Sequence, residues 1–238
     1  MTYNLQAVIR KASTNLLVQF DRLAYSTQNI SNMNTTGYKA VTFEQIIDAD
    51  GSVHGVERVD MKNGQFFATN NPLDVALTGA GFIPVTTPSG EIRYTRDGSF
   101  TTNKDGYLVT KTGDLVGSGI FIDGDAQKIE IKQNGDVFSY SRLIDEPKYM
   151  GTIPVVQFQN PQALKDVGSN EFIATENSGK MKLIEDHNYI KQYGVEYSNV
   201  NAMDEIFTVA RMNASVIASN SLIKAINQMY STAIEMTS

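Results

Sequence analysis

Apolar residues recur every seven positions near the N-terminus of the chain and at alternating spacings of three and four near its C-terminus. A repeat that averages 3.5 residues keeps one helix face toward a partner helix, as in a coiled coil. The pattern predicts one helix over about residues 4–33 and a second from near Ala202 onward. We take the stripe positions, together with Asn29 and Asn32, as the candidate subunit interface. The stripe consists of Ile9, Leu16, Leu23, Ile30, Val209, Met212, Val216, Ile223, Ile226 and Tyr230.

Polar residues mark the expected ends of both helices. Gly37 follows a run of Asn and Thr residues, and we interpret it as the residue just after the first helix, because glycine accepts the left-handed conformation. Asn201 is expected to accept hydrogen bonds from the first free amides of the second helix, and Asp204 suits the helix dipole. The Asn and Thr cluster at 29–36 has two compatible interpretations: helix capping, or side-chain amides that bridge neighbouring subunits.

The middle of the chain changes to short runs with period-two alternation, separated by turn dipeptides such as Asn63-Gly64 and Asp105-Gly106. This pattern is typical of hairpins in an antiparallel meander or barrel. The predicted fold is therefore α+β, with paired N- and C-terminal coiled-coil helices and a central antiparallel β-domain. We expect a terminal-helix assembly domain (1–36 and 202–238), connecting segments (37–60 and 190–201) and the central β-domain (61–189).

The outer faces of the predicted helices are poor in charge, although a solvated two-stranded coiled coil normally carries charge there. Apolar residues such as Leu17, Phe20, Leu222 and Met229 occupy some of these positions instead. We favour packing against neighbouring copies or sister subunits; the alternative is a stripe buried against the protein's own body. The charged residues in 1–36 and 204–238 are Arg10, Lys11, Asp21, Arg22, Asp204, Glu205, Arg211, Lys224 and Glu235.

Composition excludes several classes of protein. The chain has 238 residues, a net charge of −6 and no cysteine, which rules out disulfides, a thiolate nucleophile and cysteine zinc sites. The acidic balance gives no general basis for binding nucleic acid. No stretch approaches the roughly 20 apolar residues that cross a bilayer, so we expect no membrane insertion. The N-terminus lacks the basic and apolar regions of a cleaved signal peptide.

Residues that could carry chemistry are isolated along the chain. His54 and His187 have no partner at i,i+4, which disfavours a zinc or acid–base role. The Gly79-Ala80-Gly81 segment lacks the third glycine of a phosphate loop, and Asp123-Gly124-Asp125 lacks the ligand spacing of a calcium loop. We interpret Arg96-Asp97 as a hairpin end, with the arginine pairing locally. We expect no catalytic residue, no metal and no cofactor.

Three segments resemble one known family. Residues 29–39, Asn-Ile-Ser-Asn-Met-Asn-Thr-Thr-Gly-Tyr-Lys, resemble the N-terminal signature N-x-A-N-x-x-T-x-G-Y-K of bacterial flagellar rod and hook proteins, with Ser31 where the family usually has Ala. Residues 64–110 resemble the middle region of that family, notably Tyr-Thr-Arg-Asp-Gly-Ser-Phe at 94–100. Residues 196–201 contain Ser-Asn-Val-Asn, which resembles the start of the family's last helix.

The resemblance implies a structural subunit of the flagellar basal-body rod, the torque-transmitting axial drive shaft, which polymerises through its terminal helices. It implies three kinds of partner: copies of the chain itself, other axial proteins of the rod and hook, and the flagellar type III export apparatus. It also implies a location in the basal body outside the cytoplasm, reached without a cleaved signal peptide. The length fits a short rod component, proximal or distal, better than a hook subunit.

Two other functions are alternatives at this stage. A secreted binding module would use the helices as a stalk and the β-domain to recognise a glycan or an envelope protein. An enzyme acting on cell-wall glycan would need paired carboxylates in a cleft, and Asp136, Asp145 and Glu146 show no convincing pairing by sequence. We therefore expect a protein that is not an enzyme.

Overall fold

The computed structural model describes residues 2–49, 53–141, 146–185 and 188–235. The chain divides into two compact units. The helical unit comprises Met1–Ser31, Val41–Val59 and Val200–Ser238, and the β-unit comprises Asn32–Ala40 and Asp60–Asn199. Each unit therefore contains segments that are far apart in the sequence.

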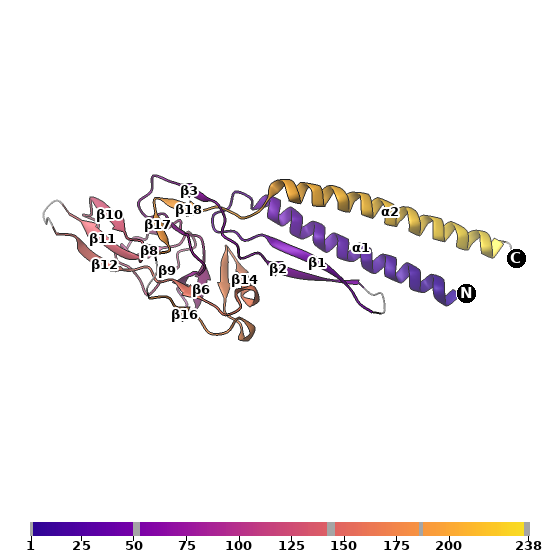
Figure 1. Ribbon diagram of the computed structural model, residues 1–238, viewed down its shortest axis with the longest axis horizontal. Coiled ribbons are helices and arrows are strands. Elements are labelled where there is room, and N and C mark those ends of the chain that lie inside the picture. Colours follow the sequence, from indigo (N-terminus) through magenta and orange to yellow (C-terminus); the bar gives the residue numbers. More distant parts are fainter. Residues whose placement is uncertain (1, 50–52, 142–145, 186–187, 236–238) are drawn as a thin grey trace. The chain divides into compact units, whose positions relative to one another are not determined.

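Two long helices form most of the helical unit. They are α1 (Thr2–Ser31) and α2 (Ala202–Glu235), and they run side by side in opposite directions (Figure 1). The observed bounds agree with the predicted helices to within the usual variation at helix ends. Asn201 caps α2 as predicted: its Oδ1 accepts from the Met203 amide at 3.1 Å, and its carbonyl accepts from the Glu205 amide at 3.1 Å. Among the residues that the structure describes, no helix combines the length and hydropathy needed to span a bilayer.

A β-hairpin completes the helical unit. Strands β1 (Val41–Ile47) and β2 (Val53–Val59) pair antiparallel over their full length, and the hairpin lies against α1. Tyr25 of α1 stacks on Phe43 of β1, with ring centroids 5.4 Å apart. The expectation that residues 37–60 serve only as a connection is therefore incomplete, because alternate residues of β1 cover part of the helix.

The β-unit is antiparallel in all its described strand pairs, as predicted. Its largest sheet has seven strands in the order β14-β15-β6-β5-β9-β8-β7, and a three-stranded sheet has the order β10-β11-β12. The strands of the larger sheet are β5 (Ile83–Thr86), β6 (Ile92–Thr95), β7 (Thr101–Thr102), β8 (Leu108–Val109), β9 (Leu115–Val116), β14 (Lys165–Gly168) and β15 (Glu171–Ile173). Those of the smaller sheet are β10 (Lys128–Ile131), β11 (Asp136–Tyr140) and β12 (Lys148–Thr152).

Three further strand pairs close the β-unit. The first strands of the unit pair with its last ones: β3 (Phe66–Ala68) with β18 (Gly194–Glu196), and β4 (Val75–Leu77) with β17 (Ile190–Gln192). The third pair joins β13 (Val156–Gln157) to β16 (Lys182–Leu183), and two short 3-10 helices, η1 (Pro161–Ala163) and η2 (Glu176–Ser178), lie near it in the sequence. Residues 190–201, expected as a connecting segment, thus supply both closing strands.

Two hydrophobic clusters fill the β-unit. The larger one contains buried side chains from seven strands, among them β4, β5, β8 and β9, and from the loops between strands. The smaller one is mainly aromatic, and its rings meet edge to face, as Tyr94 and Phe158 do at a centroid distance of 4.8 Å. The larger cluster consists of Val75, Leu77, Ile83, Phe100, Leu108, Val116, Ile120, Ile122, Ile131, Val137, Ile153, Val155 and Ile190.

Candidate assembly interface

The predicted stripe residues are largely covered within the chain. Met212 and Ile226 are only 3% and 8% exposed. The side chains of Ile9 and Tyr230 lie outside the described residues. The other stripe residues are half-buried: Leu16, Leu23, Ile30, Val209, Val216 and Ile223. The stripe therefore helps to hold the helical unit together, and its part in contacts between subunits stays a prediction.

Large apolar side chains outside the stripe are exposed on both helices. Leu17, Ile217 and Met229 expose 64%, 66% and 70% of their surface. Scattered apolar residues are normal on a protein surface, but many of them on one pair of helices make these helices a candidate contact site. The others of this kind are Phe20, Met203, Ile206, Phe207 and Leu222. Together these eight residues define what we name the exposed helix surface.

Asn29 connects three elements of the helical unit. Its Oδ1 accepts from the Val41 amide at 2.9 Å, and its Nδ2 donates to the Val41 carbonyl at 2.8 Å and to Glu205 Oε1 at 2.7 Å. The side chain is 1% exposed. Asn29 therefore fixes β1 and α2 to the last turn of α1, a role that sequence reasoning missed because the partners are distant along the chain.

Asn32, the other predicted interface amide, belongs to the β-unit. Its Oδ1 accepts from Thr35 Oγ1 at 3.1 Å, and its carbonyl accepts from the Thr35 amide at 3.0 Å. These contacts support the capping-and-turn interpretation of the cluster at 29–36. A bridge from these amides to another subunit stays a prediction.

A tyrosine and a carboxylate meet where the hairpin covers α1. The Tyr25 hydroxyl donates to Glu57 Oε2. This hydrogen bond raises the pKa of Tyr25 to about 12, and partial burial and nearby carboxylates add to the increase. A groove of about 540 Å³ runs beside the pair and is lined by Asp21, Tyr25, Phe43, Gly55, Val56 and Glu57.

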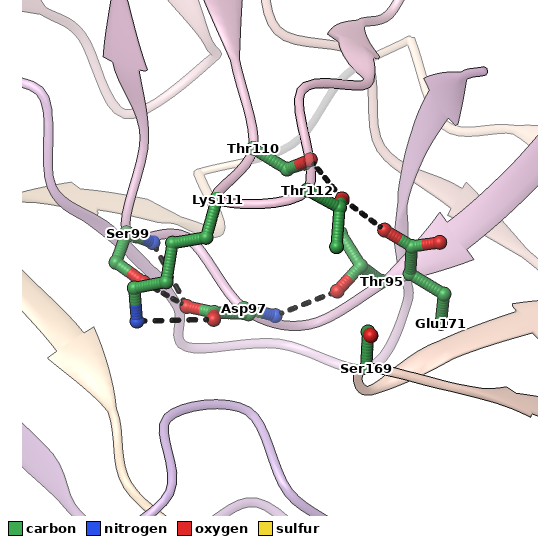
Figure 2. A pocket seen from close by; sticks show the side chains of 8 residues that line it. All are labelled: Thr95, Asp97, Ser99, Thr110, Lys111, Thr112, Ser169 and Glu171. Atoms are coloured by element: carbon green, nitrogen blue, oxygen red, sulfur yellow. Dashed lines mark hydrogen bonds and ion pairs between the residues drawn. The ribbon is translucent and has the colours of Figure 1, made fainter. Parts of the chain in front are cut away.

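A small polar pocket lies in the β-unit (Figure 2). It has a volume of about 20 Å³, which is room for roughly one water molecule. On one side, Asp97 accepts from the Ser99 amide at 3.0 Å and pairs with Lys111 at 3.5 Å. On the other side, Thr112 contacts Glu171. The volume is far below that of a typical ligand site.

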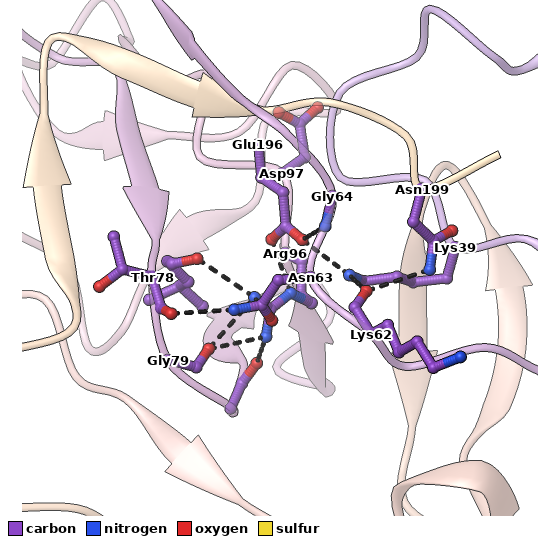
Figure 3. Close-up of polar contacts among 12 residues, drawn as sticks. Lys39, Lys62, Asn63, Gly64, Thr78, Gly79, Arg96, Asp97, Glu196 and Asn199 are labelled. Carbon is purple, nitrogen blue, oxygen red and sulfur yellow. Dashed lines mark hydrogen bonds and ion pairs between the residues drawn. The ribbon is translucent and has the colours of Figure 1, made fainter. Parts of the chain in front are cut away.

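The three family-like segments meet at a buried ionic cluster, the Arg96–Glu196–Lys39 cluster (Figure 3). The Glu196 carboxylate accepts from Arg96 Nε and from Lys39 Nζ, each at 2.7 Å. It also accepts from the Gly64 amide at 2.6 Å. All three charged residues are 2–3% exposed. Lys39, Arg96 and Glu196 come from the first, middle and last segments respectively, so the cluster joins the two ends of the β-unit to its centre.

Further hydrogen bonds satisfy the polar groups of the cluster. The Arg96 guanidinium donates to the Gly81 carbonyl at 2.6 Å and to Asn63 Oδ1 at 3.0 Å, with longer contacts to the carbonyls of Leu77 and Gly79. Burial lowers the pKa of Lys39, and the nearby Arg96 lowers it further, whereas Glu196 raises it. A buried ionic group is tolerated only where such partners exist.

Two interpretations of the sequence, one for Arg96 and one for Gly37, are wrong. Arg96 does not pair locally, because its carboxylate partner is 100 residues away along the chain. Gly37 does not cap α1, which ends at Ser31. Gly37 has φ +70°, and a Cβ there would lie 2.4 Å from the Asp97 amide nitrogen. Glycine is needed for this close approach, which lets the Gly37 amide donate to the Glu196 carbonyl at 2.8 Å.

Among the residues that the structure describes, those weighed for chemistry are not brought together into one site. His54 pairs with Asp48 at 3.0 Å on the exposed hairpin, and Asp136 is bound by Asn134 and Thr152. His187 and Asp145 lie outside the described residues. Within the described parts of the chain, no group of three or more His, Cys, Asp or Glu side chains is placed to hold a metal ion.

Comparison with known proteins agrees with this architecture. Residues 76–139 match the family model described as the flagellar hook protein FlgE/F/G D1 domain. The chain is 29% identical to the flagellar basal-body rod protein FlgG of Caulobacter vibrioides, over 97% of this chain and 99% of the relative. It is 33% identical to FlgG of Agrobacterium fabrum, over 87% and 92%, and 33% identical to FlgF of C. vibrioides, over 75% and 76%. The chain therefore belongs to the flagellar basal-body rod proteins of the FlgF/FlgG type.

Proposed function

We propose that the protein is a structural subunit of the bacterial flagellar basal-body rod that polymerises through α1 and α2 and transmits torque along the rod. The observation that carries the mode of assembly is the exposed helix surface. Full burial of one large apolar side chain stabilises an assembly by roughly 1.5–3 kcal/mol. The relatives support the same role, because they are named basal-body rod proteins.

The same proposal includes the partners and the location. Neighbouring copies and other axial proteins of the rod and hook would cover the exposed helix surface. The chain would reach the basal body through the flagellar type III export apparatus and act outside the cytoplasm, with no cleaved signal peptide. The relatives give no support to the alternative of a secreted binding module, and no catalytic role is part of the proposal.

The sharpest test changes an exposed residue, because such a change leaves the fold of the single chain intact. Ile217 is 66% exposed on α2, so I217D should leave the circular dichroism of the monomer unchanged. It should abolish rod assembly and swimming in a strain that lacks its own copy of the protein. Val216 and Ile223 are half-buried, so aspartate there would disturb the helical unit and assembly together.

The matched control is I92D, since Ile92 is 49% exposed on β6 of the β-unit. This variant introduces the same side chain outside the helices and should still assemble. Normal rods and normal swimming with I217D would contradict assembly through the helices. Equal loss with both variants would point instead to a general effect of added charge on the protein.

A further inference from the structure

Thr112 has more close oxygen neighbours than its single hydroxyl proton can serve. Its Oγ1 lies 2.6 Å from Thr110 Oγ1, 2.9 Å from Glu171 Oε1 and 2.9 Å from Asp114 Oδ2 (Figure 2 shows the first two). These are the lengths of ordinary O–H···O hydrogen bonds. Each contact therefore needs a proton between its two oxygen atoms.

Counting protons limits the charge of the two carboxyl groups. A hydroxyl donates one hydrogen bond and accepts two. All three contacts are satisfied if Thr112 accepts from Thr110, donates to one carboxylate and accepts from the other carboxyl group, which must then be protonated. If Thr112 donates to Thr110 instead, both carboxyl groups must be protonated. Two ionised carboxylates would leave at least one of these contacts without a proton.

The surroundings also disfavour two charges. Asp114 and Glu171 are 4% and 2% exposed, and like charges that are close and buried do not both ionise readily. Arg93 pairs with Glu171 at 3.1 Å, but it also serves Glu91 at 2.8 Å. Burial raises the pKa of Glu171, and the neighbouring Asp114 carboxylate raises it further, whereas hydrogen bonds from Thr112 and Arg93 lower it.

The other charged side chains that line the pocket form an ion pair of their own. Lys111 and Asp97 line the same pocket as Glu171, and they pair with one another at 3.5 Å. Among the described residues, the charged groups placed beside the two carboxyl groups are Arg93 from β6, its second partner Glu91, and the Lys111–Asp97 pair. Within this set, Arg93 is the cation that pairs with Glu171, and it is shared with Glu91.

We propose that Asp114 and Glu171 share a proton across Thr112, and that this proton-sharing pair fastens the β8–β9 turn to β15 in a pH-dependent manner. Residues 110–114 form that turn, in which the Gly113 amide donates to the Thr110 carbonyl at 3.0 Å. Glu171 is the first residue of β15. In the sheet order, β6 and β5 lie between β15 and β9, so the pair bridges strands that are not neighbours.

Losing the shared proton has a defined consequence. It removes one hydrogen bond and places a second negative charge in a buried site. The folded-state pKa of Glu171 is raised above its value in the unfolded chain. The protonated pair therefore contributes its full stabilisation of the folded state at pH values below the unfolded-state pKa. This stabilisation is lost as the pH rises through the folded-state pKa. The β8–β9 turn should therefore be held most firmly under mildly acidic conditions and loosen as the solution becomes alkaline.

The test compares the full-length protein with E171Q between about pH 5 and about pH 8, a range above the ordinary pKa of a glutamate. The glutamine amide can still donate to Thr112, but it cannot titrate. With rising pH, the thermal midpoint of the wild-type β-unit should fall by roughly 2–4 °C. Hydrogen exchange of residues 110–114 and 171–173, corrected for intrinsic exchange rates, should accelerate. In E171Q both quantities should be nearly independent of pH.

Two further variants keep the test decisive. E176Q changes an exposed glutamate of the same segment and should follow the wild type. D114N removes the other carboxyl group of the pair and should make the thermal midpoint and the hydrogen exchange nearly independent of pH, as E171Q does. If one of the two variants folds poorly, the other still provides the test. Carbon-13 spectra of the carboxyl groups should show a protonated carboxylic acid in the wild type at about pH 6, above the ordinary glutamate pKa, that is absent from E171Q.

Three results would overturn the proposal. The first is a wild-type profile that does not change with pH in this segment. The second is an unchanged pH slope in both E171Q and D114N. The third is restoration of the wild-type midpoint at alkaline pH by added calcium chloride, because a bound cation rather than a proton would then hold the two carboxylates together.

Discussion

Removing the charge of Glu196 should destabilise the β-unit more than removing any surface charge. The change is E196Q, which keeps the size of the side chain but replaces one carboxylate oxygen with an NH2 group. That group would face a donor, because both oxygens accept from cations, Arg96 and Lys39, at 2.7 Å. Both cations are 2–3% exposed, so each would stay buried after losing the carboxylate with which it is paired.

The expected magnitude follows from this burial. Breaking a buried pair by removing one partner costs about 3–5 kcal/mol. For a domain of this size, each kcal/mol shifts the thermal midpoint by roughly 2–4 °C, which gives a decrease on the order of 6–20 °C. Because burial lowers the pKa of Lys39, the variant should recover part of the loss as the pH rises and Lys39 becomes neutral.

Urea and thermal unfolding would measure the effect, followed by near-ultraviolet circular dichroism because the chain has tyrosines but no tryptophan. K148Q is the matched control, since Lys148 and Asp123 form a pair at 3.3 Å that is largely exposed. Its loss should cost less than about 1 kcal/mol. An E196Q variant no less stable than K148Q would refute the reasoning that the cluster depends on its carboxylate.

Two other changes test single contacts. N29A should cost about 1–3 kcal/mol, because it removes the side-chain partner of the amide and carbonyl of the half-buried Val41. Faster hydrogen exchange in β1 with unchanged exchange in the β-unit would show it. G37A should destabilise the β-unit by well over about 1 kcal/mol, since Ala is strained at positive φ and its Cβ would meet Asp97. G90A is the control for G37A: Gly90 has φ +86° with no atom within 4 Å of a Cβ, so equal midpoint shifts would exclude the steric contribution.

The extents of the two helices could be predicted from the sequence because the information is local, although the residue that follows α1 was misassigned. The seven-residue repeat marks the extent of α1, and Asn201 lies immediately before α2 and caps it as expected. The alternation and turn dipeptides of the middle region likewise predicted an antiparallel β-structure. The hairpin at 41–59 was missed, because its strands lie in a region interpreted as a connection. The surface that these strands pack against is one side of α1, which the sequence of the hairpin does not reveal.

The buried polar contacts could not be predicted, because each depends on residues that the fold brings together. Glu196 and Arg96 are 100 residues apart along the chain. Thr112 and Glu171 are 59 residues apart. The one available signal for the first pair was that each family-like segment carries a charged residue, Lys39, Arg96 or Glu196. Which of these charges pair with one another depends on the order of the strands in the fold, and the periodicity of the sequence does not specify that order.

The position of the ionic cluster along the chain has a mechanical consequence. Lys39 follows α1 and Glu196 precedes α2 in the sequence, and their side chains are bonded at 2.7 Å. A pull on either terminal helix would reach this bond after a few residues, before it stretches strands such as β10 to β12. Strands β10 to β12 would therefore bear little of the force. They could change in sequence or acquire insertions while the force still passes through the ionic cluster.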